Sequence, residues 1–214
     1  DLGARLGIAA SYVTLLGEDP FSDRILNLMA EENLAADLVA RLADQQPGLY
    51  VIANTPSGER SFSYWRNTSA ARQLWAEPES TARFETALNA FDCIYLSGIT
   101  LAIMQPESRQ RLWDYLISYR ESGGKLAFDS NVRLRLWRSI VEARAFISDF
   151  LAITDIALLT LEDEQALWGE EPAEAIIAKH RQRSIPEIII KQGRAPVLVY
   201  DGESVFNVDV PPVA

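Results

Sequence analysis

The chain has 214 residues, of which 48% are hydrophobic and 23% charged, a composition typical of a globular protein with one or two domains. The formal net charge of −10 argues against nucleic-acid binding, which needs a surplus of Lys and Arg, but a few arginines in a cleft can still hold a small anion. A single cysteine, Cys93, excludes an intrachain disulfide, and with no apolar run long enough to span a bilayer it favours a cytoplasmic location without membrane contact.

Apolar runs alternate with amphipathic stretches along the chain, which is the pattern of an α/β protein. In chain order the sequence predicts a strand at 12–17, a helix at 21–33, a strand at 93–98, a helix at 106–122, a strand at 125–129, a helix at 136–151, a strand at 156–160, helices at 162–168 and 172–183, and a strand at 187–191. Continuously apolar strands separated by helices indicate a doubly wound, mostly parallel sheet covered on both faces.

One segment departs from this alternation and predicts a small β-hairpin. Residues 49–54 and 60–66 are two β-like runs around a turn at 55–59. If the turn centres on Ser57, Tyr50 lies opposite Tyr64. The two-residue period then puts Arg60, Phe62, Tyr64 and Arg66 on one face, which is too polar for a core and too aromatic for a plain solvent face. We interpret the hairpin as a flap or lid beside the main sheet.

Both ends of the sequence have the pattern of interrupted elements. Residues 1–7 resemble the last turns of a helix with a glycine cap, and residues 205–210 predict a strand after a turn at 201–203. We therefore expect these 214 residues to be part of a longer protein.

Polar residues follow each predicted strand, at the edge of the sheet where doubly wound folds bind ligands. They are Ser97 and Gly98; Asp129, Asn131 and Arg133; Thr160, Glu162, Asp163 and Glu164; and Lys191, Gln192 and Gly193. Taken singly, each is explained as a loop or helix-cap residue. As a set beside a Tyr/Arg flap, they predict a binding site.

Arg66 and Arg133 are candidate ligands for a carboxylate, because a guanidinium matches carboxylate geometry with two parallel hydrogen bonds. The alternatives are a solvated strand end for Arg66 and an ion pair near the following helix for Arg133. His180 lies in the polar stretch 178–181 and is expected on the surface. One Cys and one His exclude a Cys/His zinc site, and neither a Walker-type loop nor a Gly-x-Gly-x-x-Gly turn occurs.

Several of these segments together resemble the PfkB (ribokinase-like) carbohydrate kinases. The resemblance rests on residues 11–23, 48–50, 58–60, 64–66 and 69–71, with Asp129-Ser130-Asn131-Val132-Arg133. It implies a ribokinase-like fold with an α/β core at 1–46 and 70–214 and a lid at 47–69. The tyrosines of the lid and the Asp-x-Asn-x-Arg motif are most similar to members that phosphorylate 2-keto-3-deoxygluconate with ATP and Mg²⁺.

The resemblance also implies roles for individual residues. Substrate would be bound by Tyr50, Tyr64, Trp65, Arg66, Asn131 and Arg133, and nucleotide by Asn131, Lys191, Gln192 and Gly193. The catalytic base is expected after Ala214, so that residues 1–214 alone would be inactive. The lid implies a homo-oligomer.

The chain departs from the family pattern at the Asn-x-x-Glu motif, which reads Thr160-Leu161-Glu162-Asp163 here and leaves Asp163 and Glu164 as weak candidates for a metal ligand. The alternatives to a sugar-acid kinase are a PfkB-type kinase for a neutral sugar such as fructose, which would leave two arginines without a carboxylate partner, and a non-catalytic sugar-acid-binding module.

Overall fold

The computed structural model describes residues 7–54 and 60–211, which fall into two compact units. The first unit comprises Asp1–Leu88 with Met104–Leu112, and the second comprises Asn89–Ile103 with Trp113–Ala214. Helix α5 (Pro106–Glu121) contributes residues to both. The predicted turn at 55–59 and most of the predicted helix end at 1–7 lie outside the described residues.

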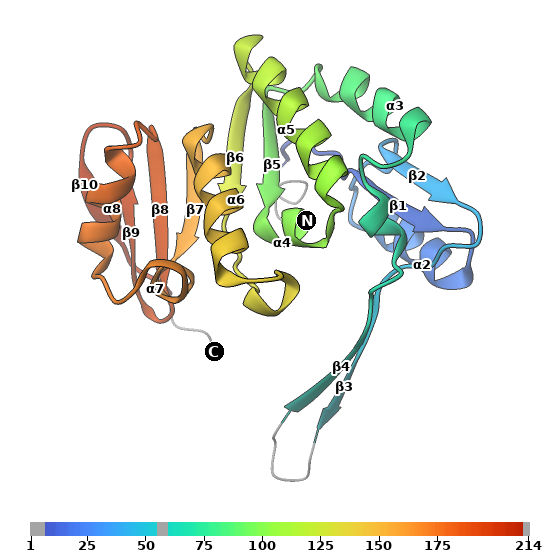
Figure 1. The fold of residues 1–214 in the computed structure, drawn as a ribbon, viewed down its shortest axis with the longest axis horizontal. Helices are drawn as coiled ribbons and strands as arrows, with labels where there is room; N and C mark the ends of the chain where they lie inside the picture. Colours follow the sequence, from blue (N-terminus) through green and yellow to red (C-terminus); the bar gives the residue numbers. More distant parts are fainter. Residues whose placement is uncertain (1–6, 55–59, 212–214) are drawn as a thin grey trace. The chain divides into compact units, whose positions relative to one another are not determined.

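The first unit contains a pair of parallel strands and the hairpin. Its elements are β1 (Thr14–Gly17), α2 (Pro20–Glu31), β2 (Val39–Leu42), β3 (Leu49–Asn54), β4 (Arg60–Trp65), the 3₁₀ helix η1 (Ala70–Gln73) and α3 (Pro78–Leu88). Strands β1 and β2 pair in parallel, and Leu16, Met29 and Val39 form a small buried core between them and α2. Within this unit, β3 and β4 form a separate two-stranded sheet that extends away from β1 and β2 (Figure 1).

The start of α2 shows how local sequence fixes an element. Asp19 is the N-cap, and its Oδ1 accepts hydrogen bonds from the backbone N–H groups of Phe21 and Ser22. Pro20 occupies the first helical position, where a missing N–H costs nothing. The hydrogen bond from the Ser22 hydroxyl, followed by smaller backbone effects, lowers the pKa of Asp19 despite some desolvation. The cap therefore stays ionised at neutral pH.

The second unit is built on one six-stranded sheet in the order β10-β9-β8-β7-β6-β5 (Figure 1). Strands β5 to β8 are parallel, and β9 and β10 are antiparallel additions. The elements are β5 (Cys93–Ser97), α4 (Gly98–Ile103), β6 (Lys125–Asp129), the 3₁₀ helix η2 (Leu134–Leu136), α6 (Ile140–Ala152), β7 (Ile156–Thr160), α7 (Leu161–Trp168), α8 (Ala173–Arg181), β8 (Glu187–Gln192), β9 (Ala195–Tyr200) and β10 (Val205–Val208).

Apolar strand residues and α6 supply the core of this unit. Phe128, Leu159 and Ile190 are buried in successive strands, and Phe128 contacts Phe150 of α6 with ring centroids 6.0 Å apart. Burial of this kind is the main favourable term in folding, at about 25 cal/mol per Å² of apolar surface. No helix among the described residues is both long and apolar enough to cross a bilayer.

Two features of the fold correct the sequence-based expectations. The helix predicted at 136–151 begins only at Ile140, because Ser139 caps it by accepting from the Glu142 N–H, while 134–136 form a 3₁₀ turn. His180 was expected on the surface, but it is completely buried on the inner face of α8. Strand β2 and helix α3 were not predicted.

Candidate functional site

The aromatic face of the hairpin has the predicted register. Tyr50 of β3 pairs directly with Tyr64 of β4, and their ring centroids are 6.2 Å apart. Phe62 stacks on Tyr64 at 6.2 Å, which confirms that these two share a face. The side chain of Arg60, the fourth residue expected on this face, lies outside what the structure describes. Tyr50 is 58% exposed and Tyr64 37%, so the phenol rings are accessible to a ligand.

Arg66 belongs to the same face. Its guanidinium carbon lies 4.4 Å from the centroid of the Tyr64 ring, a cation–π contact. The same guanidinium carries five N–H donors that can bind a carboxylate. The hairpin therefore presents an arginine beside two tyrosine hydroxyls.

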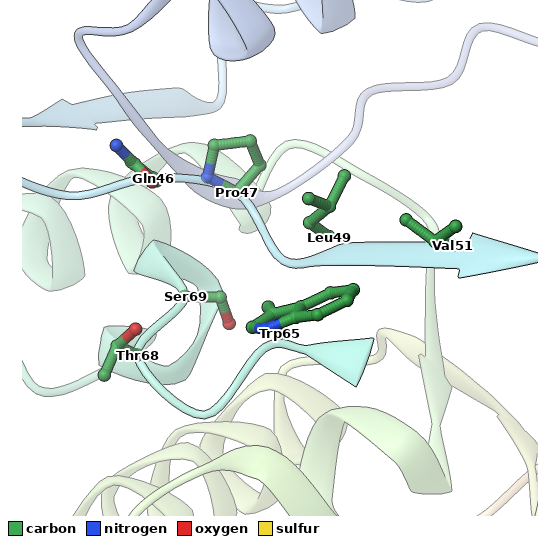
Figure 2. A pocket seen from close by; sticks show the side chains of 7 residues that line it. All are labelled: Gln46, Pro47, Leu49, Val51, Trp65, Thr68 and Ser69. Carbon is green, nitrogen blue, oxygen red and sulfur yellow. The ribbon is translucent and has the colours of Figure 1, made fainter. Parts of the chain in front are cut away.

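Trp65 lies on the opposite face of the hairpin, because side chains alternate along a strand. It pairs with Leu49 and, together with Val51, lines an open pocket of about 520 Å³. Figure 2 shows the Trp65 indole below Leu49, with Thr68 and Ser69 beside it. None of the residues that the structure describes along this pocket is charged. The structure thus separates Trp65 from Tyr50, Tyr64 and Arg66, and its predicted role in substrate binding stays a prediction.

The second unit assembles the predicted polar residues at the carboxyl ends of its parallel strands. Pairing in register places Ser97 of β5 next to Asp129 of β6. The Asn131 side chain donates to the Ser97 hydroxyl at 3.3 Å, and the Lys191 ammonium lies 3.7 Å from Asp129 Oδ1. Residues following β5, β6 and β8 therefore meet at one edge, as the sequence predicted.

The loop after β6 has a conformation that few residue types adopt. Asn131 has a φ of 32°, in the left-handed region that Asn tolerates better than most residues. Its N–H donates to Asp129 Oδ1 at 3.2 Å, which closes a tight turn. Gly98, at the start of α4, passes so close to this loop that a Cβ would overlap the Ser130 carbonyl oxygen. Only glycine fits there.

Arg133 and Asp163 lie together on the other side of that loop. Asp163 Oδ2 accepts from the Val132 N–H at 3.0 Å, and Asp163 Oδ1 is 3.9 Å from an Arg133 nitrogen. The Arg133 side chain also donates to the Val132 carbonyl and is 46% exposed. The ion pair is therefore loose, and the arginine can engage an anion.

The segment expected to bind nucleotide forms the turn between β8 and β9. Lys191 and Gln192 end β8, and Gly193 has a φ of 62°, which a glycine adopts without strain. The Gln192 side-chain amide donates to the Pro196 carbonyl at 2.8 Å. This bond fixes the turn, so Gln192 contributes to its shape.

Tyr95 is a residue of this edge that the sequence reasoning missed. Its hydroxyl donates to Asp129 Oδ2 at 2.9 Å. Partial burial, and then the hydrogen bond to the Asp129 carboxylate, raise the pKa of Tyr95 to about 12. The phenol therefore stays protonated and remains a donor. A period-two reading could have found it, because Tyr95 is two residues before Ser97 on the same face of β5.

Glu164 and His180 form a buried pair between α7 and α8. Glu164 Oε2 lies 2.8 Å from His180 Nε2, and both side chains have no solvent exposure. The Lys179 ammonium lies 3.8 Å from the same carboxylate oxygen. Glu164 therefore joins two helices and does not face the strand ends.

No cluster of three or more His, Cys, Asp or Glu side chains suited to a metal ion occurs among residues 7–54 and 60–211. Of the two candidate ligands, Glu164 is engaged with His180, and Asp163 holds Val132 and faces Arg133. A magnesium ion bound mainly by protein carboxylates thus does not fit these residues.

The fold agrees with comparisons to known proteins. The family model of the pfkB family carbohydrate kinases matches residues 2–214. The chain belongs to this family. The 2-dehydro-3-deoxygluconokinase of Escherichia coli (strain K12) is 44% identical over 207 residues, which are 96% of this chain and 66% of that protein. The chain thus spans just under two thirds of the length of this pfkB relative.

Solved structures support the ribokinase-like architecture. A PfkB protein from Polaromonas sp. JS666 superposes with a TM-score of 0.88 at 24% identity, covering 98% of this chain and 69% of that one. The fructokinase of Vibrio cholerae O395, bound to fructose, ADP and calcium, gives 0.79 at 21% identity, covering 99% and 66%. At these identities the likeness concerns the fold alone.

Proposed function

We propose that the protein containing this chain is an ATP-dependent kinase that phosphorylates 2-dehydro-3-deoxy-D-gluconate, also called 2-keto-3-deoxygluconate, at its terminal hydroxyl. The observation that carries the choice of substrate is the cation–π contact of Arg66 with Tyr64, opposite Tyr50. The 44% identity to a 2-dehydro-3-deoxygluconokinase supports the same choice.

The hairpin suits a sugar acid for a physical reason. A carboxylate accepts two parallel hydrogen bonds from a guanidinium edge, and contact with the Tyr64 ring restricts the Arg66 side chain before the ligand binds. Less conformational entropy is then lost on binding. The Tyr50 and Tyr64 hydroxyls supply the donors and acceptors that a polyhydroxylated chain requires. A neutral sugar would leave the arginine without a charged partner.

The strand ends of the second unit suit a nucleoside triphosphate. Lys191 is half exposed and Asn131 is held in an unusual conformation, while the loosely paired Arg133 stays a candidate for the substrate carboxylate. Phosphoryl transfer depends on positioning and on charge stabilisation of this kind, with in-line attack by the sugar hydroxyl. Mg²⁺ would then be held mainly by the phosphate oxygens and water.

Neither strand-end aspartate is assigned as the base that takes the hydroxyl proton. Asp129 already accepts from Tyr95 and Asn131, and Asp163 accepts from Val132. Each of these carboxylates is therefore already engaged in a hydrogen bond that shapes the loop after β6.

A coupled assay of ADP release across a panel of sugars tests the proposal. The whole protein should turn over 2-dehydro-3-deoxygluconate with a higher kcat/KM than fructose or ribose. Equal or faster turnover of fructose would contradict the proposed substrate and indicate a kinase for a neutral sugar. Binding of the sugar acid without any binding of ATP would indicate a non-catalytic module.

A further inference from the structure

The sheet register brings three polar side chains onto one face of the second unit. Ser97 pairs with Asp129, so Tyr95, two residues earlier in β5, shares the face of Asp129. Asp129 pairs with Leu158 of β7, and Thr160, two residues later, pairs with Lys191 of β8. Tyr95, Asp129 and Lys191 therefore point to the same side of the sheet, from three different strands.

These three side chains form a continuous chain of contacts. The Tyr95 hydroxyl donates to Asp129 Oδ2 at 2.9 Å, and the Lys191 ammonium lies 3.7 Å from Asp129 Oδ1. That second oxygen also accepts from the Asn131 N–H at 3.2 Å. Both oxygens of Asp129 are thus engaged, and the plane of the carboxylate is set from two sides.

The lysine is the solvent-accessible end of this series of contacts. Its side chain is 44% exposed, whereas that of Asp129 is 14% exposed. An ammonium group has three donors, and within residues 7–54 and 60–211 the contact with Asp129 is the one ion pair found for Lys191. The remaining donors can reach an anion in solvent.

We propose that Tyr95 and Asp129 are positioning residues that hold the Lys191 ammonium for the phosphates of a nucleoside triphosphate. This inference rests on the proposed function, in which Lys191 belongs to the nucleotide site. A lysine carries about 2 kcal/mol of rotamer entropy, and fixing it in advance lowers the cost of ordering it on binding. Removing the Tyr95 hydroxyl frees one carboxylate oxygen, so Asp129 and the lysine it anchors sample more orientations.

The first test is nucleotide binding to the whole protein without sugar, measured by calorimetry for ATP and for adenosine. Tyr95→Phe should raise the Kd for ATP about three- to tenfold, the loss expected for one hydrogen bond to a charged group at a half-exposed site. The Kd for adenosine should not change. Tyr115→Phe is the matched control, because its hydroxyl donates to Asn89 Oδ1 at 3.2 Å on the same unit.

The decisive test is a double-mutant cycle with Lys191→Met. If Tyr95 acts through Lys191, Tyr95→Phe should not weaken ATP binding further when the lysine is absent. An equal loss in both backgrounds would mean that Tyr95 has only a general structural role and would overturn the inference. An unchanged Kd for Tyr95→Phe alone would overturn it as well.

The outcomes separate this inference from the proposed function. Failure of the cycle in a protein that binds ATP and phosphorylates the sugar acid overturns only the positioning role. If the double-mutant cycle gives the expected result but the protein is specific for fructose, only the proposed substrate is overturned. A whole protein that binds no ATP overturns both.

Discussion

The Arg66 guanidinium lies over the Tyr64 ring, with its central carbon 4.4 Å from the ring centroid. This cation–π contact places the arginine beside the tyrosine hydroxyls, where its N–H donors can bind a carboxylate. This relationship leads to the first prediction.

Arg66→Ala in the whole protein should weaken binding of 2-dehydro-3-deoxygluconate roughly ten- to a hundredfold, since a hydrogen bond to a charged group is worth ~1.5–3 kcal/mol. Calorimetry with the sugar acid and with an analogue lacking the carboxylate measures it. Arg24→Ala, at an exposed position of α2, is the control. If acid and analogue weaken equally, Arg66 supports the hairpin and does not bind the acid group.

Asp163→Ala should raise the KM for ATP about tenfold, because the loop carrying Asn131 and Arg133 loses the acceptor for the Val132 N–H. Asp163→Asn keeps an acceptor oxygen and should stay within about threefold of the wild type on the same basis. Steady-state kinetics at several magnesium concentrations measure both variants. An Asn variant as damaged as the Ala variant, with an altered magnesium dependence, would instead indicate a direct role with the metal.

Gly98→Ala should reduce both stability and nucleotide affinity, since the new Cβ overlaps the Ser130 carbonyl oxygen and displaces the loop before Asn131. Overpacking of this kind costs ~1–3 kcal/mol, visible in thermal unfolding. Gly123→Ala is the comparison, because Gly123 has a φ of 97° but open space around it. It should lower stability by ~1–2 kcal/mol without changing the Kd for ATP. Equal effects of the two variants on ATP binding would contradict the role given to Gly98.

His180→Ala should destabilise the protein by ~3–5 kcal/mol, because it leaves the Glu164 carboxylate buried without its principal partner. The double variant Glu164→Leu/His180→Phe should lose less, since replacing both partners of a buried hydrogen bond by apolar groups can be nearly neutral. Urea unfolding measures both. A double variant less stable than His180→Ala would show that the pair itself contributes net stability.

The Tyr95 phenol should ionise near pH 12, above its ordinary value of 10. Because the folded protein holds this proton more tightly than the unfolded chain, the contribution of Tyr95 to stability is present below pH 10. It is lost as the pH rises from about 10 to about 12. The difference in absorbance at alkaline pH between wild type and Tyr95→Phe measures the ionisation. A difference titration centred near pH 10 would contradict the hydrogen bond to Asp129.

Much of this arrangement could be predicted from the sequence, because it depends on short-range patterns. The pairing of Tyr50 with Tyr64 follows from the length of one local turn and the two-residue period of strands. The gathering of Ser97, Asp129 and Lys191 follows from the rule that parallel strands end at one edge. The cap at Asp19 is likewise local.

The residues that were missed depend on contacts between distant elements. His180 is flanked by Lys179 and Arg181, so its surroundings in the sequence are polar, yet it shares the buried face of α8 with Ile176 and Ile177. The spacing of three and four residues between these isoleucines and His180 could have indicated the shared face. Its partner Glu164 lies on another helix, and no local pattern indicates that pairing. Tyr95 was overlooked because a tyrosine within an apolar strand is equally typical of a core.

The ion pair between Asp129 and Lys191 also limits the size of the side chains on β7, the strand between them. The contact spans β7 on the face that bears Leu158 and Thr160, and Thr160 is in register with Lys191. A longer side chain at position 160 would compete with the lysine stem for the space above the sheet. Homologous chains that keep both ends of this ion pair should therefore keep a small residue at position 160, and those with a larger one should have lost the pair.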